Sequence, residues 1–182
     1  HHHDPLGLGR RELLTGAGTL NTDVNILANG TLAPALDASG LNTGILTING
    51  NTVFGANAAY AVDLNGSVAG TSYDQVVTGA GFTFNTTGAV LSPTRPTTFN
   101  PALTTVLRIV DGNTAMPGVF SNAPNGGFLY INGLYFLVTY NPTAGDLTLT
   151  RQEPAASPTK LIIDDNGVTA GPVAAGGSFT VS

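Results

Sequence analysis

Two aspartates offer the chain its best chance of acid or base chemistry, because its only histidines are His1, His2 and His3 and it has no cysteine. Asp63 and Asp74 lie eleven positions apart. Two carboxylates could serve as the acid and base of a glycosidase or supply oxygen ligands to Ca²⁺. Aspartate is also common at turns, where its side chain accepts backbone hydrogen bonds. We favour this structural interpretation and expect a protein that is not an enzyme.

A second acidic stretch lies near the C-terminus. Asp164, Asp165 and Asn166 are rich in oxygen ligands and precede Gly167. The stretch lacks the spaced ligands and the final glutamate of an EF-hand loop, and a tight Asn-Gly turn explains the same residues. We therefore name these three residues as a candidate Ca²⁺ site; the alternative is that they form a turn without a ligand. We expect no other cofactor.

Aromatic residues gather late in the chain. They are Phe120, Phe128, Tyr130, Tyr135, Phe136 and Tyr140. Aromatic side chains are usually buried because each removes a large area from water, but exposed rings can stack on sugars. We expect Tyr130 and Tyr140 to be the exposed members and name them as candidate glycan-binding residues.

Composition excludes several classes of function. Without native histidine or cysteine, the chain cannot form a Ser-His-Asp triad or a His/Cys zinc site. Its six basic residues are scattered and its net charge is −5, so we expect no nucleic-acid partner, which would require a basic surface. A membrane-spanning helix needs an apolar run of about 20 residues. The chain has no run of that kind, so we expect no membrane insertion.

The pattern of apolar residues predicts an all-β fold. Tyr60, Val62 and Leu64 alternate with less apolar residues, as in strands with one buried face. Tight turns are indicated by Asn-Gly pairs. These pairs occupy positions 29–30, 49–50, 65–66, 125–126, 132–133 and 166–167.

The early segments recur at a spacing of roughly 16 to 20 positions, which is typical of a β-solenoid with one coil per repeat. Later strands are expected at 105–110, 127–131, 134–140 and 146–150. Asn132-Gly133 separates two of them as in a hairpin. We therefore expect a β-solenoid with an antiparallel C-terminal cap; a β-sandwich or jelly roll is the alternative.

The expected organisation has three parts. Residues 1–11 are interpreted as an expression tag and linker, and residues 12–152 as the solenoid-like domain with its cap. Residues 153–182 combine a proline-containing linker with two candidate strands, at 160–163 and 178–181. These strands either dock on the main domain or belong to a truncated module.

Several segments resemble the autotransporter-associated β-strand repeats of bacterial passenger domains and other surface proteins. The segments are 16–20, 24–34, 44–54, 60–66 and 73–76, followed by 107–112, 118–120, 134–140 and 145–149. The resemblance implies a right-handed β-helix in an exported, non-catalytic, repeat-containing protein at the cell surface. The expected function is a stalk or adhesin scaffold that meets a cell-surface glycan or a host or neighbouring surface. The alternative is a carbohydrate-binding β-sandwich module of an adhesin.

Overall fold

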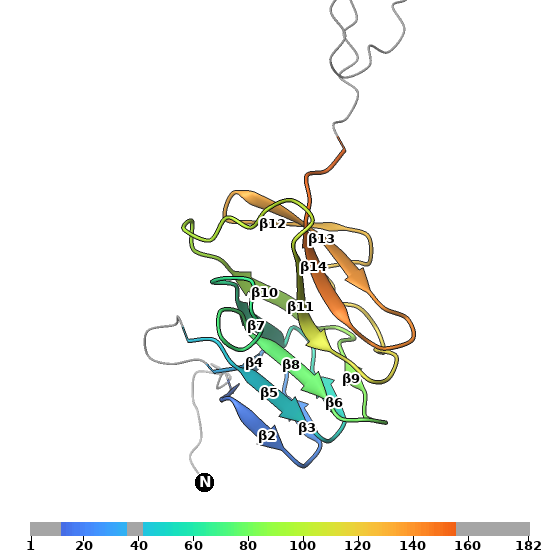
Figure 1. The fold of residues 1–182 in the computed structure, drawn as a ribbon. Coiled ribbons are helices and arrows are strands. Elements are labelled where there is room, and N and C mark those ends of the chain that lie inside the picture. The colour runs from blue at the N-terminus through green and yellow to red at the C-terminus, as the bar shows by residue number, and fades with distance from the viewer. Residues whose placement is uncertain (1–11, 36–41, 156–182) are drawn as a thin grey trace, which may run out of the picture.

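The computed structural model describes residues 12–35 and 42–155, and this part of the chain is all-β (Figure 1). It contains fourteen strands and no helix, as the alternating pattern predicts. Within the described residues, no helix is long and apolar enough to cross a membrane. The tag interpreted at 1–11 and the candidate strands at 160–163 and 178–181 lie outside the described residues.

The strands form three sheets. The first contains, in spatial order, β1 (Leu13–Thr15), β4 (Thr31–Ala33), β7 (Ala59–Asp63) and β10 (Val90–Thr94). The second contains β12 (Phe128–Ile131), β13 (Leu134–Tyr140), β14 (Leu147–Arg151), β11 (Val106–Asp111), β8 (Gln75–Thr78), β5 (Ile45–Ile48) and β2 (Gly18–Leu20). The third contains β3 (Val24–Ile26), β6 (Thr52–Phe54) and β9 (Phe84–Asn85).

Up to β11, each strand pairs in parallel with the strand three places along the chain. Leu46 of β5 lies beside both Gly18 of β2 and Val76 of β8, so in-register partners are 28 and then 30 positions apart in the sequence. The predicted spacing of 16 to 20 positions holds for β1 and β4, where Leu13 and Thr31 are 18 apart, but the other parallel pairs are 28 or more positions apart. Successive Asn-Gly turns lie between different pairs of strands, 29–30 between β3 and β4 and 49–50 between β5 and β6, so their spacing is shorter than most distances between paired residues.

The pairing becomes antiparallel after β11. This strand is parallel to β8 on one side and antiparallel to β14 on the other, with a register irregularity between Arg108 and Val110. Strands β12 and β13 form the expected hairpin, and Ile131 faces Leu134 across the turn. Asn132 and Gly133 both have positive φ, 43° and 96°. This is the backbone conformation that two-residue hairpin turns require.

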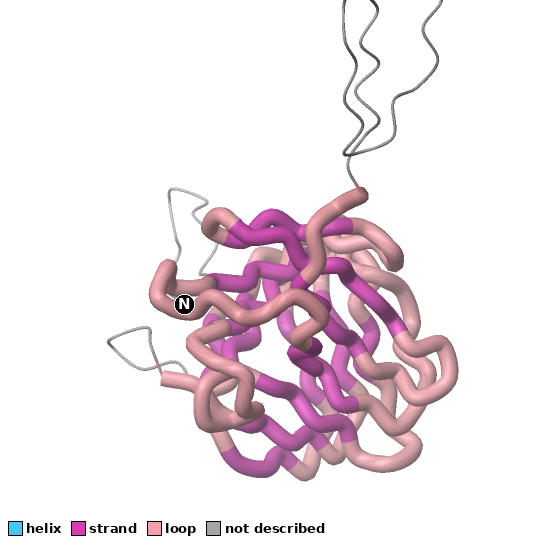
Figure 2. The backbone as a smooth tube through the Cα atoms, turned by 45° about the horizontal axis from the view of Figure 1, so that its top comes forward, coloured by secondary structure: helices cyan, strands magenta, loops and turns pink. Residues whose placement is uncertain are grey.

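The core lies on the inward faces of these sheets. Tyr60, Phe84 and Phe120 are fully or almost fully buried, and Tyr60 stacks on Phe120 at a centroid distance of 6.1 Å. The Tyr60 hydroxyl donates to the Ile109 carbonyl at 2.7 Å, so its polar atom is satisfied inside the core. Short turns connect some of the strands, and longer loops follow β7, β10 and β11 (Figure 2).

Polar side chains connect successive turns. The Asn49 amide donates to Asn21 Oδ1 at 2.8 Å. Nearby, Asp23 Oδ1 accepts the Asn51 N–H at 2.7 Å, and Asn51 Oδ1 accepts the Thr83 N–H at 3.1 Å. These bonds supply partners for turn N–H groups outside the sheet ladders.

Candidate functional site

Asp74 is buried in a structural position. It precedes β8, its side chain is almost inaccessible, and its two carboxylate oxygens accept the N–H groups of Gly44 and Asp63, both at 2.9 Å. Burial raises the pKa of Asp74 to about 6, although the two backbone N–H groups favour its charged form. The carboxylate thereby joins the segment before β5 to the end of β7.

Asp63 is also engaged. It ends β7, and its Oδ1 accepts the hydroxyl of Thr94 at the end of β10. The structure thus brings the Asp63 backbone N–H to the Asp74 carboxylate and gives each carboxylate a partner within the fold. These contacts agree with the structural interpretation of the two aspartates.

The candidate Ca²⁺ ligands Asp164, Asp165 and Asn166 lie outside the described residues. Among the residues that the structure does describe, no group of three or more histidine, cysteine, aspartate or glutamate side chains is placed to hold a metal ion. The calcium site stays a prediction.

Tyr140 is buried, contrary to the expectation of an exposed ring. Only 9% of its surface is accessible, because it ends β13 on the inward face beside Leu147. Its hydroxyl accepts the Phe120 N–H at 3.0 Å and donates to the Ala123 carbonyl at 2.9 Å. Burial raises the pKa of the Tyr140 hydroxyl to about 12. A ring held in this way cannot stack on a sugar.

Tyr130 is exposed, as expected, with 65% of its surface accessible. It faces Tyr135 across the hairpin, and their ring centroids are 4.9 Å apart. Phe128, two positions earlier on the same face, is 37% exposed and packs edge-on against Tyr135 at 6.4 Å. The exposed rings of Phe128 and Tyr130 and the partly buried ring of Tyr135 therefore form one cluster, which we call the outer aromatic face.

The outer aromatic face continues across the second sheet. Phe128 lies beside Leu137, which lies beside Thr150, which in turn lies beside the exposed Val106. Sequence reasoning selected Tyr130 but missed Phe128 and Tyr135. The hairpin pattern contained the missing signal, because alternate positions on facing strands share one side of a sheet.

A hollow of about 400 Å³ lies beside β12 and includes Arg95 in its wall. The buried Arg95 guanidinium donates to the carbonyls of Ile131 and Pro96, at 3.3 and 3.0 Å, and also to those of Phe99 and Asn132. Burial, with a smaller contribution from Arg151, lowers the pKa of Arg95. Its N–H groups all donate to backbone carbonyls. This arginine therefore holds the β12–β13 hairpin against the segment that follows β10.

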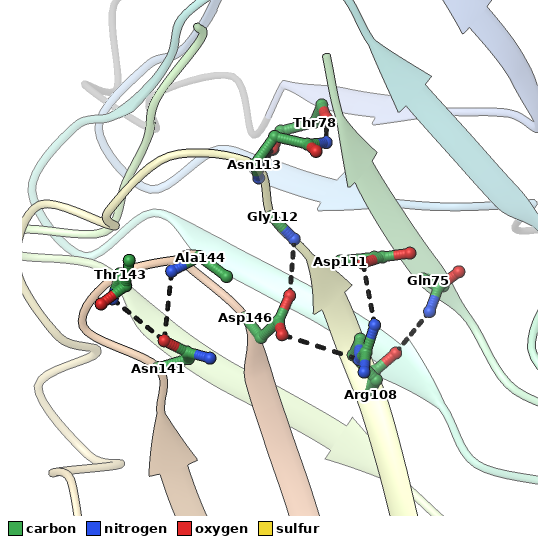
Figure 3. A network of polar contacts seen from close by, with 10 residues as sticks. All are labelled: Gln75, Thr78, Arg108, Asp111, Gly112, Asn113, Asn141, Thr143, Ala144 and Asp146. Carbon is green, nitrogen blue, oxygen red and sulfur yellow. Dashed lines mark hydrogen bonds and ion pairs between the residues drawn. The ribbon is translucent and has the colours of Figure 1, made fainter. Parts of the chain in front are cut away.

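A polar network lies where parallel and antiparallel pairing meet (Figure 3). Arg108 contacts Asp111 at 3.1 Å and Asp146 at 3.8 Å, and Asp146 also accepts the Gly112 N–H at 3.0 Å. Gln75 donates to the Arg108 carbonyl at 2.8 Å. The hydrogen bond from Arg108 to Asp111, followed by the charge of Asp146, raises the pKa of Arg108. This network links β8 and β11 to Asp146, which immediately precedes β14.

No family model, curated protein or solved structure matches the chain.

Proposed function

We propose that residues 12–152 form a short β-solenoid with an antiparallel cap, and that this unit is a non-enzymatic stalk or scaffold segment of an exported bacterial surface protein. One observation carries the proposal: up to β11, each strand pairs in parallel with the strand three places along the chain, so the chain visits the three sheets in a fixed order. A chain that returns to the same sheet after every third strand makes one coil per three strands. The chain-length difference between paired residues, 28 for Gly18 and Leu46, is then the length of one coil.

The use of the polar residues supports a scaffold. Asp74 joins two backbone segments, Arg95 clamps the hairpin, and Tyr140 connects β13 to the preceding loop. In an active site, titratable groups face a cleft that a substrate can enter. In this chain, the side chains of Asp74, Arg95 and Tyr140 bond to backbone groups, and these bonds stabilise the fold.

The sequence supports the location. Its 9% charged residues fall well below the roughly 25% of ordinary soluble domains, and its segments resemble autotransporter-associated repeats. We therefore place the protein outside the cell, without membrane insertion by this segment.

Duplication of one coil tests the architecture. A second copy of residues 59–89, inserted before Val90, preserves the register because Ala59 and Val90 are in-register partners. A solenoid accepts the insertion and lengthens by about 5 Å, the spacing of neighbouring strands. Small-angle X-ray scattering measures the length, and circular dichroism reports the folded state.

A matched control duplicates residues 59–74 only, inserted before Gln75. This half-coil would place β7 where β8 belongs, so we expect a loss of cooperative unfolding. If the full-coil variant unfolds as readily as the half-coil variant, the coil assignment is wrong. A β-sandwich predicts that result, because its strand order cannot absorb three extra parallel strands.

A second candidate function is carbohydrate binding by the outer aromatic face. The exposed rings of Tyr130 and Phe128 favour it, because sugars stack on aromatic faces. A glycan array, run with calcium and then with EDTA, tests this function and the candidate site at 164–166 together. Binding that is lost in Tyr130→Ala but kept in Val53→Ala, at an exposed position of the third sheet, would support the aromatic face. Absence of binding to every glycan would contradict it.

A further inference from the structure

The hollow beside Tyr130 lies between two strand edges. Its lining consists of residues 93–95 on one side, residues 129–132 on the other, and Asn122. Strand β10 is the last strand of the first sheet and β12 is the last of the second, so the hollow separates the outer edges of two sheets (Figure 1). Its volume of about 400 Å³ lies within the usual range of small-ligand pockets, roughly 300–1,000 Å³.

Pro93 turns its carbonyl to the outer edge of β10. The Leu64 N–H donates to the Thr94 carbonyl at 2.9 Å, so the backbone of Thr94 faces β7. Backbone groups of consecutive strand residues point to opposite sides, and Pro93 therefore faces away from β7. Proline has no N–H, and no described residue donates to the Pro93 carbonyl. This carbonyl is an unused hydrogen-bond acceptor.

Two asparagines hold the positions on either side of Pro93. Asn122 bonds to both the N–H and the carbonyl of Leu91, each at 2.8 Å, and Asn132 Nδ2 donates to the Arg95 carbonyl at 2.9 Å. Both asparagines line the hollow, so it lies on the side of the strand to which the Pro93 carbonyl points. An amide nitrogen carries two N–H groups. Within the described residues, each asparagine keeps one N–H for a ligand, on a side chain that the backbone already holds in place.

Tyr130 contributes to the opposite wall. Its partner across the hairpin, Tyr135, accepts the Gln152 N–H at 3.2 Å, so the backbone of Tyr135 faces away from β12. Tyr130 and Tyr135 are thus a non-hydrogen-bonded pair, and the Tyr130 N–H and carbonyl point to the outer edge of β12. The side chain of Tyr130 is exposed. This one residue therefore offers a donor, an acceptor and an aromatic face.

The hollow has no charged group available to a ligand. Arg95 is the one charged residue in its lining. Four of the five N–H groups of this guanidinium already donate to backbone carbonyls. A carboxylate or phosphate that binds arginine in the bidentate mode takes two parallel N–H groups, and Arg95 has one left. An anion would lose water here without gaining a matched partner, so the lining favours an uncharged ligand.

We propose that this hollow is a sugar subsite that holds one uncharged pyranose ring of a glycan. The ring packs against Tyr130. Its hydroxyl groups both donate and accept hydrogen bonds, so they match the Pro93 carbonyl and the free N–H groups of Asn122 and Asn132. The inference rests on the carbohydrate-binding function proposed above, and adds to it the position and the charge of the bound sugar.

Isothermal titration calorimetry of the full chain tests the charge of the ligand. The uncharged probes are cellohexaose and β-1,4-mannohexaose. The matched probes are the same oligosaccharides oxidised to uronic acids at C6, which places a carboxylate on each ring. We expect at least one uncharged probe to bind, and its oxidised form to bind at least tenfold more weakly. Equal affinity for the two forms would overturn the preference for an uncharged sugar.

Thr94→Phe distinguishes the hollow from the outer aromatic face. Thr94 is exposed and lines the hollow, so a phenyl ring at this position fills it and leaves Tyr130 in place. We expect the affinity to fall at least tenfold. Thr94→Val is one control, because it loses the same hydroxyl bond to Asp63 without adding a ring. Thr19→Phe, at the opposite edge of the second sheet, is the other. Both controls should keep the affinity within about twofold.

Failure of the subsite and failure of the glycan function give different results. Binding that is lost in Tyr130→Ala but unchanged in Thr94→Phe overturns the subsite and keeps the aromatic face. Absence of binding by both uncharged probes also overturns the subsite, whereas the glycan function fails only if the whole array is blank.

A measurement on the wild type replaces Thr94→Phe if that variant does not fold by circular dichroism. Nitrogen–proton correlation spectra are recorded during titration with the uncharged probe that binds. Shifts of the Tyr130 N–H and of the side-chain amides of Asn122 and Asn132 support the subsite. Shifts confined to the backbone N–H groups of Phe128 and Tyr135 overturn it.

Discussion

Asn122 satisfies both backbone groups of Leu91 on the outer edge of β10. Its Oδ1 accepts the Leu91 N–H and its Nδ2 donates to the Leu91 carbonyl, each at 2.8 Å. In a parallel ladder, both groups of one residue point to the same side of the strand. One side chain therefore takes the place of a neighbouring strand.

This relationship predicts the effect of Asn122→Ala. The substitution leaves two edge groups to water, and we expect a loss of about 1 kcal/mol in the free energy of unfolding, measured by urea denaturation. Asn122→Asp keeps the acceptor for the Leu91 N–H but sets a carboxylate oxygen against the Leu91 carbonyl, so it should not restore the lost stability. Asn100→Ala, in an exposed loop, is the control. Equal stability of Asn122→Ala and Asn100→Ala would contradict the role assigned to Asn122.

Tyr140→Phe tests the buried hydroxyl. Without it, the Phe120 N–H and the Ala123 carbonyl lose their partner in the core. We expect the free energy of unfolding to fall by about 1–3 kcal/mol. Tyr130→Phe, at an exposed ring, should change it by less than about 0.5 kcal/mol. The reverse order would show that the two tyrosines have been assigned wrongly.

Asp74 predicts a pH dependence of stability. Its pKa is about 6 in the folded protein, above the ordinary 3.8, so the folded state holds the proton more tightly. The resulting stabilisation is complete below about pH 4 and is lost as the pH rises through 6. It amounts to at most about 3 kcal/mol. Urea unfolding of the wild type and Asp74→Asn should be measured at pH 4 to 7. The free energy of unfolding of the wild type, minus that of Asp74→Asn, should be larger at pH 4 than at pH 7. A difference independent of pH would rule out the raised pKa.

Arg95 predicts a local effect on the hairpin. Arg95→Met leaves the carbonyls of Ile131 and Asn132 without their charged donor. We expect a loss of about 2 kcal/mol and faster hydrogen exchange in β12 and β13. Arg95→Lys keeps the charge but reaches fewer carbonyls, so its hydrogen-exchange rates in β12 and β13 should lie between those of the wild type and Arg95→Met. If exchange instead rises evenly over all strands, Arg95 does not act locally.

The strands were largely predictable from sequence, whereas their partners were not. Alternation placed Tyr60, Val62 and Leu64 correctly on a buried face, and Asn132-Gly133 identified the hairpin. These signals are local: side-chain direction alternates along one strand, and a two-residue turn fixes its own register.

The distance between paired residues depends on which turns connect two strands directly and which begin a longer loop. Both kinds of turn use asparagine and glycine, so the sequence does not distinguish them. Tyr140 shows the same limit for the site. Its position on a strand was predictable, but its burial depends on the loop that carries Phe120 and Ala123. The short motif around Asn122 gave no sign that its side chain would complete an edge of β10.

The spacing between aligned residues grows along the chain. Thr31 and Ala59 are 28 positions apart, whereas Ile45 and Gln75 are 30 apart, although their strands remain in register. The two additional residues lie in the segment between β7 and β8, which forms a loop outside the sheets. The loop is closed by its own hydrogen bonds, from Asn65 N–H to the Ser72 carbonyl and from Val68 N–H to Ser72 Oγ. Foreign peptides inserted at this loop would be displayed on the outside of an unchanged body, which makes the fold a natural carrier for epitopes.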